Sequence, residues 1–260
     1  IGTSGYTLGK LLALWFNGFT ALKTFSNLSA TTLASSCFAY MFNGCTALTA
    51  TPTLQIRTMA TSCCNSMFYD CASLKSVSPF MTKDTVMASS CCCQMFQNCI
   101  SLTKAPALPA TALASNCYNS MFKFCKELTE VPELPATTLK SSCYSNMFYR
   151  CTALTIAPIL SVTVLAESCC DSMFRYCSSL TAAPILPAIT LVANCYYLMF
   201  DGCSKINYVK ALFTTTPGSD YTNNWLLSVA SEGTFVKSKD ATWDVVGASG
   251  IPNGWTVMTE

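Results

Sequence analysis

The apolar residues of this chain follow a long-range repeat. A Met-Phe pair returns at one fixed interval, lengthened by two residues at a single step, and Trp15-Phe16 stands in the first copy. The interval is about 26 residues, and a fixed period in this range is typical of solenoid proteins, in which stacked repeats share one hydrophobic core. The pairs occupy positions 41/42, 67/68, 95/96, 121/122, 147/148, 173/174 and 199/200.

One half of each repeat has the apolar spacing of a helix. Cys117, Met121 and Cys125 are four residues apart, and Phe122 widens the apolar face. Positions i, i+4 and i+8 fall on one side of an α-helix. We therefore expect one or two helical turns in this half.

The other half of each repeat predicts a short strand. Leu102, Ala105 and Leu108 supply its apolar side chains, and Pro106 and Pro109 interrupt it. Proline is incompatible with a helix interior and is tolerated in edge-type strands and turns. This half is therefore expected to form a short extended segment followed by a turn.

These two halves predict an α/β repeat fold, a right-handed leucine-rich-repeat solenoid of about eight 26-residue coils. Short parallel strands are expected on one face and short helices on the other. The array covers residues 1–212, with a degenerate first repeat as N-terminal cap, and residues 213–260 form a C-terminal capping segment. The two extra residues between Val77 and Met87 are expected to bulge from a turn and leave the coils in register.

The last part of the chain has the composition of a lid, because it is rich in large aromatic residues. We expect a short helix over residues 225–230, begun at Asn223 or Asn224, and a strand over residues 234–237. The residues expected to cover the open end of the core are Trp225, Phe235, Trp243 and Trp255.

Fourteen of the eighteen cysteines form two columns that follow the repeat. Leu11 and Phe19 fill the same positions in the first repeat, which indicates core positions that accept apolar side chains. Disulfides between neighbouring repeats are the alternative, since eight helical residues within one repeat span about 12 Å, too far for a disulfide. A zinc or iron–sulfur site is not expected, because these sites favour closer cysteine pairs or histidine. The columns are 37, 63, 91, 117, 143, 169, 195 and 45, 71, 99, 125, 151, 177, 203.

The composition argues against catalysis. The chain has no histidine, so neither a Ser/His/Asp triad nor a Cys/His dyad can form. Glu130 and Glu133 are the only close carboxylate pair expected on the strand side, and an open repeat face offers no cleft for a glycosidase. No nucleotide-binding glycine motif occurs. We predict that the protein is not an enzyme and holds no cofactor or metal.

Charge and hydropathy narrow the range of partners. Charged residues make up 11% of the chain and the formal net charge is +2. This small charge predicts no general attraction to nucleic acid or to anionic membranes. No window has the roughly 18 continuous apolar residues that a bilayer-spanning helix needs, so no membrane span is expected.

Two columns of non-core residues are candidate binding surfaces, because equivalent positions of stacked repeats form ladders. The helical-side ladder combines aromatic rings with cations, which suits stacking on sugars or anchoring a protein. The alternative is that these rings only cover neighbouring repeats. The helical-side candidates are Tyr69, Lys123, Phe124, Tyr149, Arg150, Arg175 and Tyr176, and the strand-side candidates are Glu133, Ile159 and Ile185.

Several phrases carry a family resemblance. CYNSMFKFC, ELTEVPELPATTL and, after the array, GTFVK followed by GIPNGWTV resemble the BspA-like leucine-rich-repeat surface proteins of anaerobic gut and oral bacteria. The resemblance implies an extracellular or cell-surface recognition and adhesion module that binds a host or matrix protein or a glycan. The chain starts at Ile1 without a basic leader, so we expect an export signal to have been removed or to lie upstream.

A second function is compatible with the same repeats. A structural spacer or shaft in a cell-surface or phage-like assembly would display another domain and bind nothing itself. We expect a monomer in either case.

Overall fold

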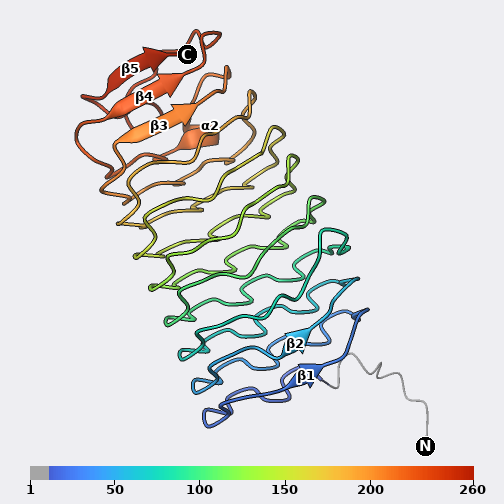
Figure 1. The fold of residues 1–260 in the computed structure, drawn as a ribbon. Helices are drawn as coiled ribbons and strands as arrows, with labels where there is room; N and C mark the ends of the chain where they lie inside the picture. The colour runs from blue at the N-terminus through green and yellow to red at the C-terminus, as the bar shows by residue number, and fades with distance from the viewer. Residues whose placement is uncertain (1–11) are drawn as a thin grey trace, which may run out of the picture.

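The chain forms a stack of coils in which each coil lies on the one before it (Figure 1). The computed structural model describes residues 12–260, so residues 1–11 of the predicted N-terminal cap lie outside the described residues. Backbone hydrogen bonds join adjacent coils, most often from an N–H to the carbonyl of the residue just before its equivalent in the next repeat. For example, the Phe122 N–H donates to Met147 O at 3.0 Å, and the Phe148 N–H donates to Met173 O at 2.9 Å.

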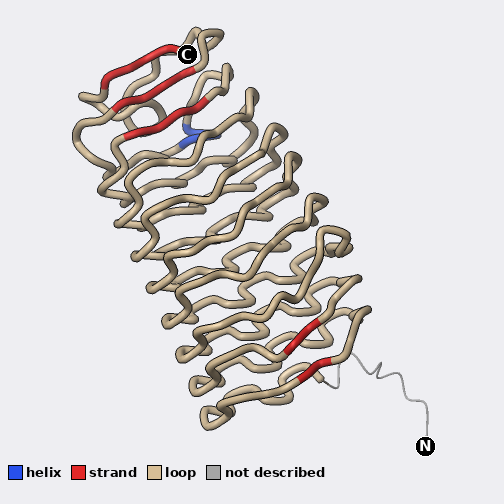
Figure 2. Tube along the Cα trace, in the orientation of Figure 1, coloured by secondary structure: helices blue, strands red, loops and turns tan. Residues whose placement is uncertain are grey.

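Regular secondary structure is confined to the two ends of the described stack, and the coils between them are turns and loops (Figure 2). Near the N-terminus, β1 and β2 pair in parallel. Near the C-terminus, β3, β4 and β5 form a parallel sheet in that order. The elements are β1 (Asn27–Leu28), β2 (Thr53–Leu54), β3 (Tyr208–Ala211), α2 (Ser219–Thr222), β4 (Thr234–Lys237) and β5 (Thr256–Thr259).

Parallel pairing between coils continues on the strand face as isolated bridges. Lys104 bridges Glu130, and Leu134 bridges Leu160, in each case one repeat apart in the sequence. Proline recurs on this face, as at Pro132 beside the Glu130 bridge, and a proline has no N–H to donate to a neighbouring strand. The prolines therefore limit the pairing to single bridges.

The other face corrects the expectation of short helices. The Tyr144 and Phe148 N–H groups donate to the next coil, whereas those of Met147 and Cys151 close turns onto the carbonyls three residues before them. A helix would instead use i to i−4 bonds throughout. The segments predicted to be helical are ribbons of consecutive turns, and residues 225–230, also expected to be helical, contain turns and no helix.

A repeat of four residues explains why the helical prediction was wrong. Ser142, Asn146 and Arg150 have left-handed backbone, with φ of 53°, 54° and 59°. Because the conformation returns every fourth residue, Cys143 and Cys151 point to the same side and are both fully buried. The turn ribbon thus produces the i, i+4, i+8 pattern of a helix without helical hydrogen bonds.

The core is built from columns of identical side chains. The ring of Phe148 stacks on those of Phe122 and Phe174, with centroids 5.7 and 5.5 Å apart and planes within 11° of parallel. The Met, Cys and Leu columns beside this stack are also fully buried through the middle coils. Stacking supplies each coil with the apolar contacts that a single repeat cannot make alone. The right-handed leucine-rich-repeat assignment stays a prediction.

The two-residue insertion leaves the stack intact, as predicted. Ala50 bridges Ser76 at the usual repeat separation, and Thr58 bridges Val86 at a separation that is longer by two residues. The step of the pairing register therefore grows by two residues within the SPFMTKDTV segment. Later coils return to the shorter step.

The C-terminal segment covers the last coil with aromatic side chains. The turn ribbon continues into it, since Asn224 and Ser228 again have positive φ. All four predicted lid residues are buried, and three indole N–H groups find backbone acceptors. These residues are Trp225, Phe235, Trp243 and Trp255.

All eighteen cysteines are free, and all except the partly exposed Cys93 are buried. The predicted burial of both cysteine columns is therefore confirmed. In the second column each thiol donates to the carbonyl of a Phe in the preceding coil, as from Cys151 Sγ to Phe122 O at 3.2 Å and Cys177 Sγ to Phe148 O at 3.0 Å. Each of these carbonyls also accepts the N–H of its own turn, as Phe148 O does from Cys151 N at 3.0 Å, so the thiol is a second, weak donor to it.

Native thiols are expected to resist alkylation. Burial raises the pKa of Cys125 to about 12 and that of Cys93 to about 11, so both remain protonated at pH 8, where the thiolate is the reactive form. Labelling with iodoacetamide should be slow in the native protein and should approach 18 thiols in denaturant without reductant. A count far below this value in denaturant would reveal disulfides instead.

Candidate functional site

The exposed residues of the turn face come from one turn in each coil. In the segment 148–151, Cys151 N–H donates to Phe148 O at 3.0 Å, and the side chains of Phe148 and Cys151 are fully buried. The two residues between them, Tyr149 and Arg150, remain on the outside, half-buried and exposed respectively. The Met-Phe-x-x-Cys pattern therefore marks two positions outside the apolar core in each coil, although the side chains of Gln97 and Asp201 at such positions are covered by their neighbours.

Three adjacent coils fill these positions with rings and cations. Their turns span residues 122–125, 148–151 and 174–177, and the structure brings six of the predicted site residues together. We call this surface the cation–aromatic row. Its members are Lys123, Phe124, Tyr149, Arg150, Arg175 and Tyr176.

The rings of the row pack edge to face from coil to coil. The Phe124 and Tyr149 centroids are 5.6 Å apart with planes at 80°, and the Tyr149 and Tyr176 centroids are 5.8 Å apart at 89°. Edge-to-face packing is a favourable arrangement of aromatic quadrupoles. The rings thus connect the three coils at the surface.

Each cation of the row lies over a ring. Lys123 Nζ is 4.8 Å from the centroid of Tyr149, and Arg150 Cζ is 4.9 Å from that of Tyr176. Arg175 Cζ is also 4.9 Å from the Tyr176 centroid. Cation–π contacts at these distances restrain the long side chains and hold their charges at the surface.

Three residues of the row have a left-handed backbone conformation, which is unfavourable for residues with a Cβ. Phe124, Arg150 and Tyr176 have φ of 65°, 59° and 61°, and each is the third residue of its turn. The equivalent position is glycine at Gly44 and Gly202, the type that turns with positive φ prefer there. A left-handed residue with a Cβ costs roughly 1–2 kcal/mol. Left-handed residues other than glycine recur in every coil of the ribbon, among them Tyr40, Gln94 and Leu198, so the row is distinguished by its large side chains at this turn position and not by the left-handed conformation itself.

We expect this strain to reverse the usual ranking of glycine and alanine at position 150. Arg150→Gly should be more stable than Arg150→Ala by about 1 kcal/mol, because both lose the same side-chain contacts and only alanine keeps the left-handed penalty. Lys126, an exposed residue without positive φ, is the control. There alanine should be the more stable by about 0.5–1 kcal/mol. Urea unfolding of the four variants measures both differences, and the same order at both positions would contradict the prediction.

Asp201 ends the row with an ion pair. Its Oδ2 lies 2.8 Å from Arg175 Nε, and Arg175 Nη2 donates to the Tyr176 hydroxyl at 3.2 Å. Partial burial alone would lower the pKa of Arg175, but the hydrogen bond and the negative charge of Asp201 outweigh it and raise that pKa above its usual value. Asp201 thereby fixes the guanidinium of Arg175.

Gly202 provides the space on which Tyr176 rests. A Cβ at Gly202 would lie 2.2 Å from Cδ1 of the Tyr176 ring, so a larger residue would displace that ring. Neither Asp201 nor Gly202 was among the predicted site residues. The signal was present, because they occupy the same two positions as Arg175 and Tyr176 one repeat later.

Tyr69 does not join the row. Its hydroxyl is 3.5 Å from Gln97 Nε2, and the neighbouring Asp70 accepts a hydrogen bond from Asn98 Nδ2 at 2.6 Å. Gln97 and Asn98 occupy the two surface positions of the coil between Tyr69 and Lys123. This uncharged coil separates Tyr69 from the row.

The strand-side candidates lie apart from the row, beside the isolated bridges. Glu133 lines an open hollow of about 390 Å³ between proline-rich segments of two coils. Ile159 and Ile185 are 72% and 52% exposed. Glu130 is paired with Lys104 at 2.7 Å, so the predicted carboxylate pair is not a pair of free acids. These residues form an apolar and weakly charged surface.

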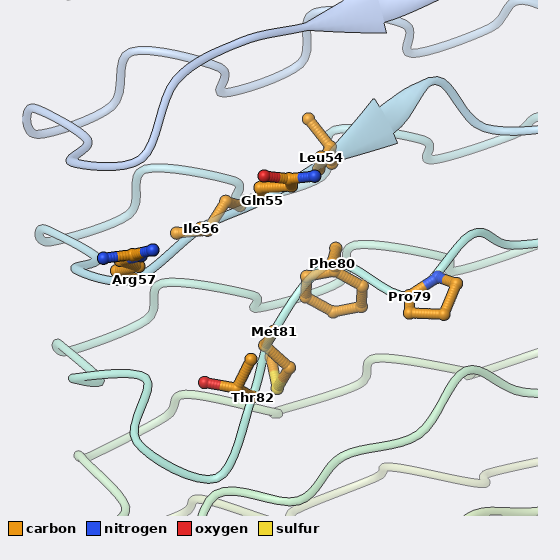
Figure 3. A pocket seen from close by; sticks show the side chains of 8 residues that line it. All are labelled: Leu54, Gln55, Ile56, Arg57, Pro79, Phe80, Met81 and Thr82. Carbon is orange, nitrogen blue, oxygen red and sulfur yellow. The ribbon is translucent and has the colours of Figure 1, made fainter.

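A second hollow, of about 320 Å³, opens between two coils beside the insertion (Figure 3). Its walls are the segments 54–57 and 79–82, and the buried side chains of Ile56 and Phe80 supply much of the lining. The lining contains Arg57 but no carboxylate, histidine or cysteine. These lining residues therefore supply no acid–base pair.

Within residues 12–260, His, Cys, Asp and Glu side chains do not gather in groups of three that would hold a metal ion. None of the helical segments in this part of the chain has the length and apolar content needed to cross a membrane. Comparison of the chain with models of protein families, with curated proteins and with solved structures found no match.

Proposed function

We propose that the chain is a non-catalytic recognition and adhesion module, and that it binds a protein or glycan partner through the cation–aromatic row. The single observation that carries this proposal is the gathering of six aromatic and cationic side chains from three adjacent coils into one packed row. Packing alone does not require large side chains at positions 124, 150 and 176, since other coils have glycine there. Binding of a partner by these large side chains is a reason for them to be retained at positions where glycine would be more stable.

The chemistry of the row supports binding. Tyrosine and arginine are enriched among residues that dominate binding free energy, because each combines a large contact area with directional polar groups. In the row, such side chains are held by neighbouring coils before any partner arrives. A surface ordered in advance loses less conformational entropy on binding.

The cellular location and the kind of partner belong to the same proposal. We propose that the chain is a member of the BspA-like leucine-rich-repeat proteins, because its sequence phrases resemble theirs. On the same basis we propose a monomer at the bacterial cell surface or outside the cell, with a host or matrix partner. A spacer or shaft that displays other domains is the competing function. The regular stack of coils suits either role.

Arrays of glycans and matrix proteins provide the test. For a ligand found in this way, Tyr149→Ala combined with Tyr176→Ala should weaken binding by about 2 kcal/mol or more, because truncation of anchoring aromatic residues typically has this effect. Ile159→Ala combined with Ile185→Ala removes exposed apolar area on the strand side and is the matched control.

The result separates the two functions. A change within about 1 kcal/mol for the tyrosine pair, together with a large loss for the isoleucine pair, would move the site to the surface around Glu133. Absence of any ligand on the arrays, or no loss from either pair, would favour the spacer.

A further inference from the structure

The cation–aromatic row carries one cation in each of three adjacent coils. Lys123, Arg150 and Arg175 lie 4.8, 4.9 and 4.9 Å from a tyrosine centroid. These contacts place the cations against the ring faces, so the rings serve mainly to position charge. The surface offered to a partner is therefore a line of N–H donors with positive charge.

Most of this charge is not neutralised within the protein. Of the ion pairs among the described residues, the one between Arg175 and Asp201 is the only one that involves the row. Asp171 is a further acidic group close enough to Arg175 to interact with it. Lys123 and Arg150 have no carboxylate partner in the described part of the chain.

The repeat of side chains along the stack sets the geometry of a ligand. The ring centroids of Phe122, Phe148 and Phe174, which are equivalent residues of the three coils, are 5.7 and 5.5 Å apart. An extended polymer along the stack axis, with negative charges at this spacing or a multiple of it, would engage several cations of the row together.

We propose that the row binds an acidic polysaccharide, a glycan chain bearing carboxylate or sulfate groups that lies along the stack axis across residues 123–176. This inference rests on the proposed function and specifies its ligand. Sulfate and carboxylate oxygens accept charge-assisted hydrogen bonds from lysine and from the guanidinium fork of arginine. The glycan hydroxyls would find hydrogen-bonding partners in the Tyr149 and Tyr176 hydroxyls.

An acidic peptide fits the same surface less well. The N–H groups of Phe124, Arg150 and Tyr176 already donate to the next coil, at 2.8, 2.9 and 2.7 Å. The backbone of the row therefore cannot pair with an added strand, which is a principal way of binding extended peptides. Alternate side chains of a strand are also spaced by about 6.6 Å, wider than the 5.7 and 5.5 Å between equivalent rings of these coils.

A single-stranded nucleic acid is also disfavoured. Proteins that bind such strands stack bases on open aromatic faces. In the row, cations approach the faces of Tyr149 and Tyr176. The formal net charge of +2 adds little general attraction for a phosphate backbone.

The test compares three polymers of matched length by calorimetry: dextran sulfate, uncharged dextran and poly-L-glutamate. We expect binding of dextran sulfate, weakening as salt is raised from about 50 to 200 mM, and no binding of uncharged dextran. Lys123→Gln combined with Arg150→Gln should weaken dextran sulfate binding by about tenfold or more, since hydrogen bonds to charged groups are lost. Glutamine is suited to position 150 because Gln94 already has φ of 55°.

Lys83→Gln combined with Lys239→Gln is the control, because it removes the same charge from exposed positions outside the row. It should change the affinity by less than about twofold. Equal losses in the two double variants would overturn the inference, because binding would then reflect overall charge. Thermal unfolding midpoints within a few degrees of the unmodified protein confirm that both variants fold.

Other outcomes overturn the inference and distinguish it from the proposed function. Poly-L-glutamate binding as tightly as dextran sulfate would identify the row as a site for acidic peptides. Failure to bind dextran sulfate, with a neutral array ligand that depends on Tyr149 and Tyr176, would reject the acidic glycan and retain the recognition module. Failure of every polymer and every array ligand would reject both.

Discussion

Replacing Phe148 with alanine is expected to lower the free energy of unfolding by about 3–5 kcal/mol, because the change leaves a cavity in the middle of a continuous ring stack. The Phe148 ring is fully buried and lies between those of Phe122 and Phe174 at 5.7 and 5.5 Å. Neither neighbour can fill the gap without leaving its own stack. Both coils adjacent to the substitution therefore lose contacts.

Urea unfolding followed by circular dichroism measures this change, and Ile159→Ala is the matched control. Ile159 is apolar but 72% exposed, so its truncation should alter stability by less than about 0.5 kcal/mol. A Phe148→Ala variant within about 1 kcal/mol of the control would mean that the ring stack contributes little to the core. Phe148→Leu, which refills part of the space, should show a smaller loss than alanine.

The second large effect is expected at the C-terminal lid. Trp225→Ala should cost about 3–5 kcal/mol, because it removes a fully buried ring and exposes the last coil. The Trp225 indole contacts Tyr196, Phe213 and Phe235 at centroid distances of 6.4, 5.8 and 6.0 Å. In a stack of repeats, each coil contacts only its neighbours. Loss of the Trp225 side chain should therefore reduce the protection of backbone amides from hydrogen exchange in the last coils first.

The indole N–H of Trp225 makes a separable contribution. It donates to Gly250 O at 2.8 Å, so Trp225→Phe keeps an aromatic ring but leaves this carbonyl without its partner. The decrease in the free energy of unfolding should therefore be smaller for Trp225→Phe than for Trp225→Ala. Trp15→Ala is the control, since Trp15 is 60% exposed at the other end of the described stack. Amide hydrogen exchange in the Trp225→Ala variant measures this effect. Exchange that becomes faster along the whole chain, and not mainly near the C-terminus, would contradict a local role for the lid.

The proposed site and the core place opposite demands on the same turns. In the segment 148–151, Phe148 and Cys151 are buried and set the turn, while Tyr149 and Arg150 are left at the surface. The left-handed backbone at Arg150 lowers stability, and the stack of coils compensates for it. Substitutions in the row should therefore affect binding far more than folding.

Much of the architecture follows from the sequence alone. The recurrence of the Met-Phe pair predicted the stacking of coils, and Pro106 and Pro109 predicted short extended segments on one face, which in the middle coils pair only as isolated bridges. The burial of the cysteine columns was predicted from the apolar residues at the same positions of the first copy, and the cysteines are buried, although Phe19 at one of these positions is 58% exposed in the first coil. These inferences succeed because a repeat places equivalent residues in equivalent surroundings.

The tertiary structure decided what the pattern left ambiguous. The spacing of Cys143, Met147 and Cys151 fits a helix and a four-residue turn ribbon equally well, and only hydrogen bonds between coils distinguish the two. The same pattern predicted the rings and cations of the row, but the spacing of apolar residues did not predict the strained backbone at Arg150, for which the glycines at the equivalent positions 44 and 202 are the signal. That strain, and the separation of Tyr69 from the row, arise because contacts between residues one repeat apart determine the backbone conformation, whereas local spacing reports only which side of the chain is apolar.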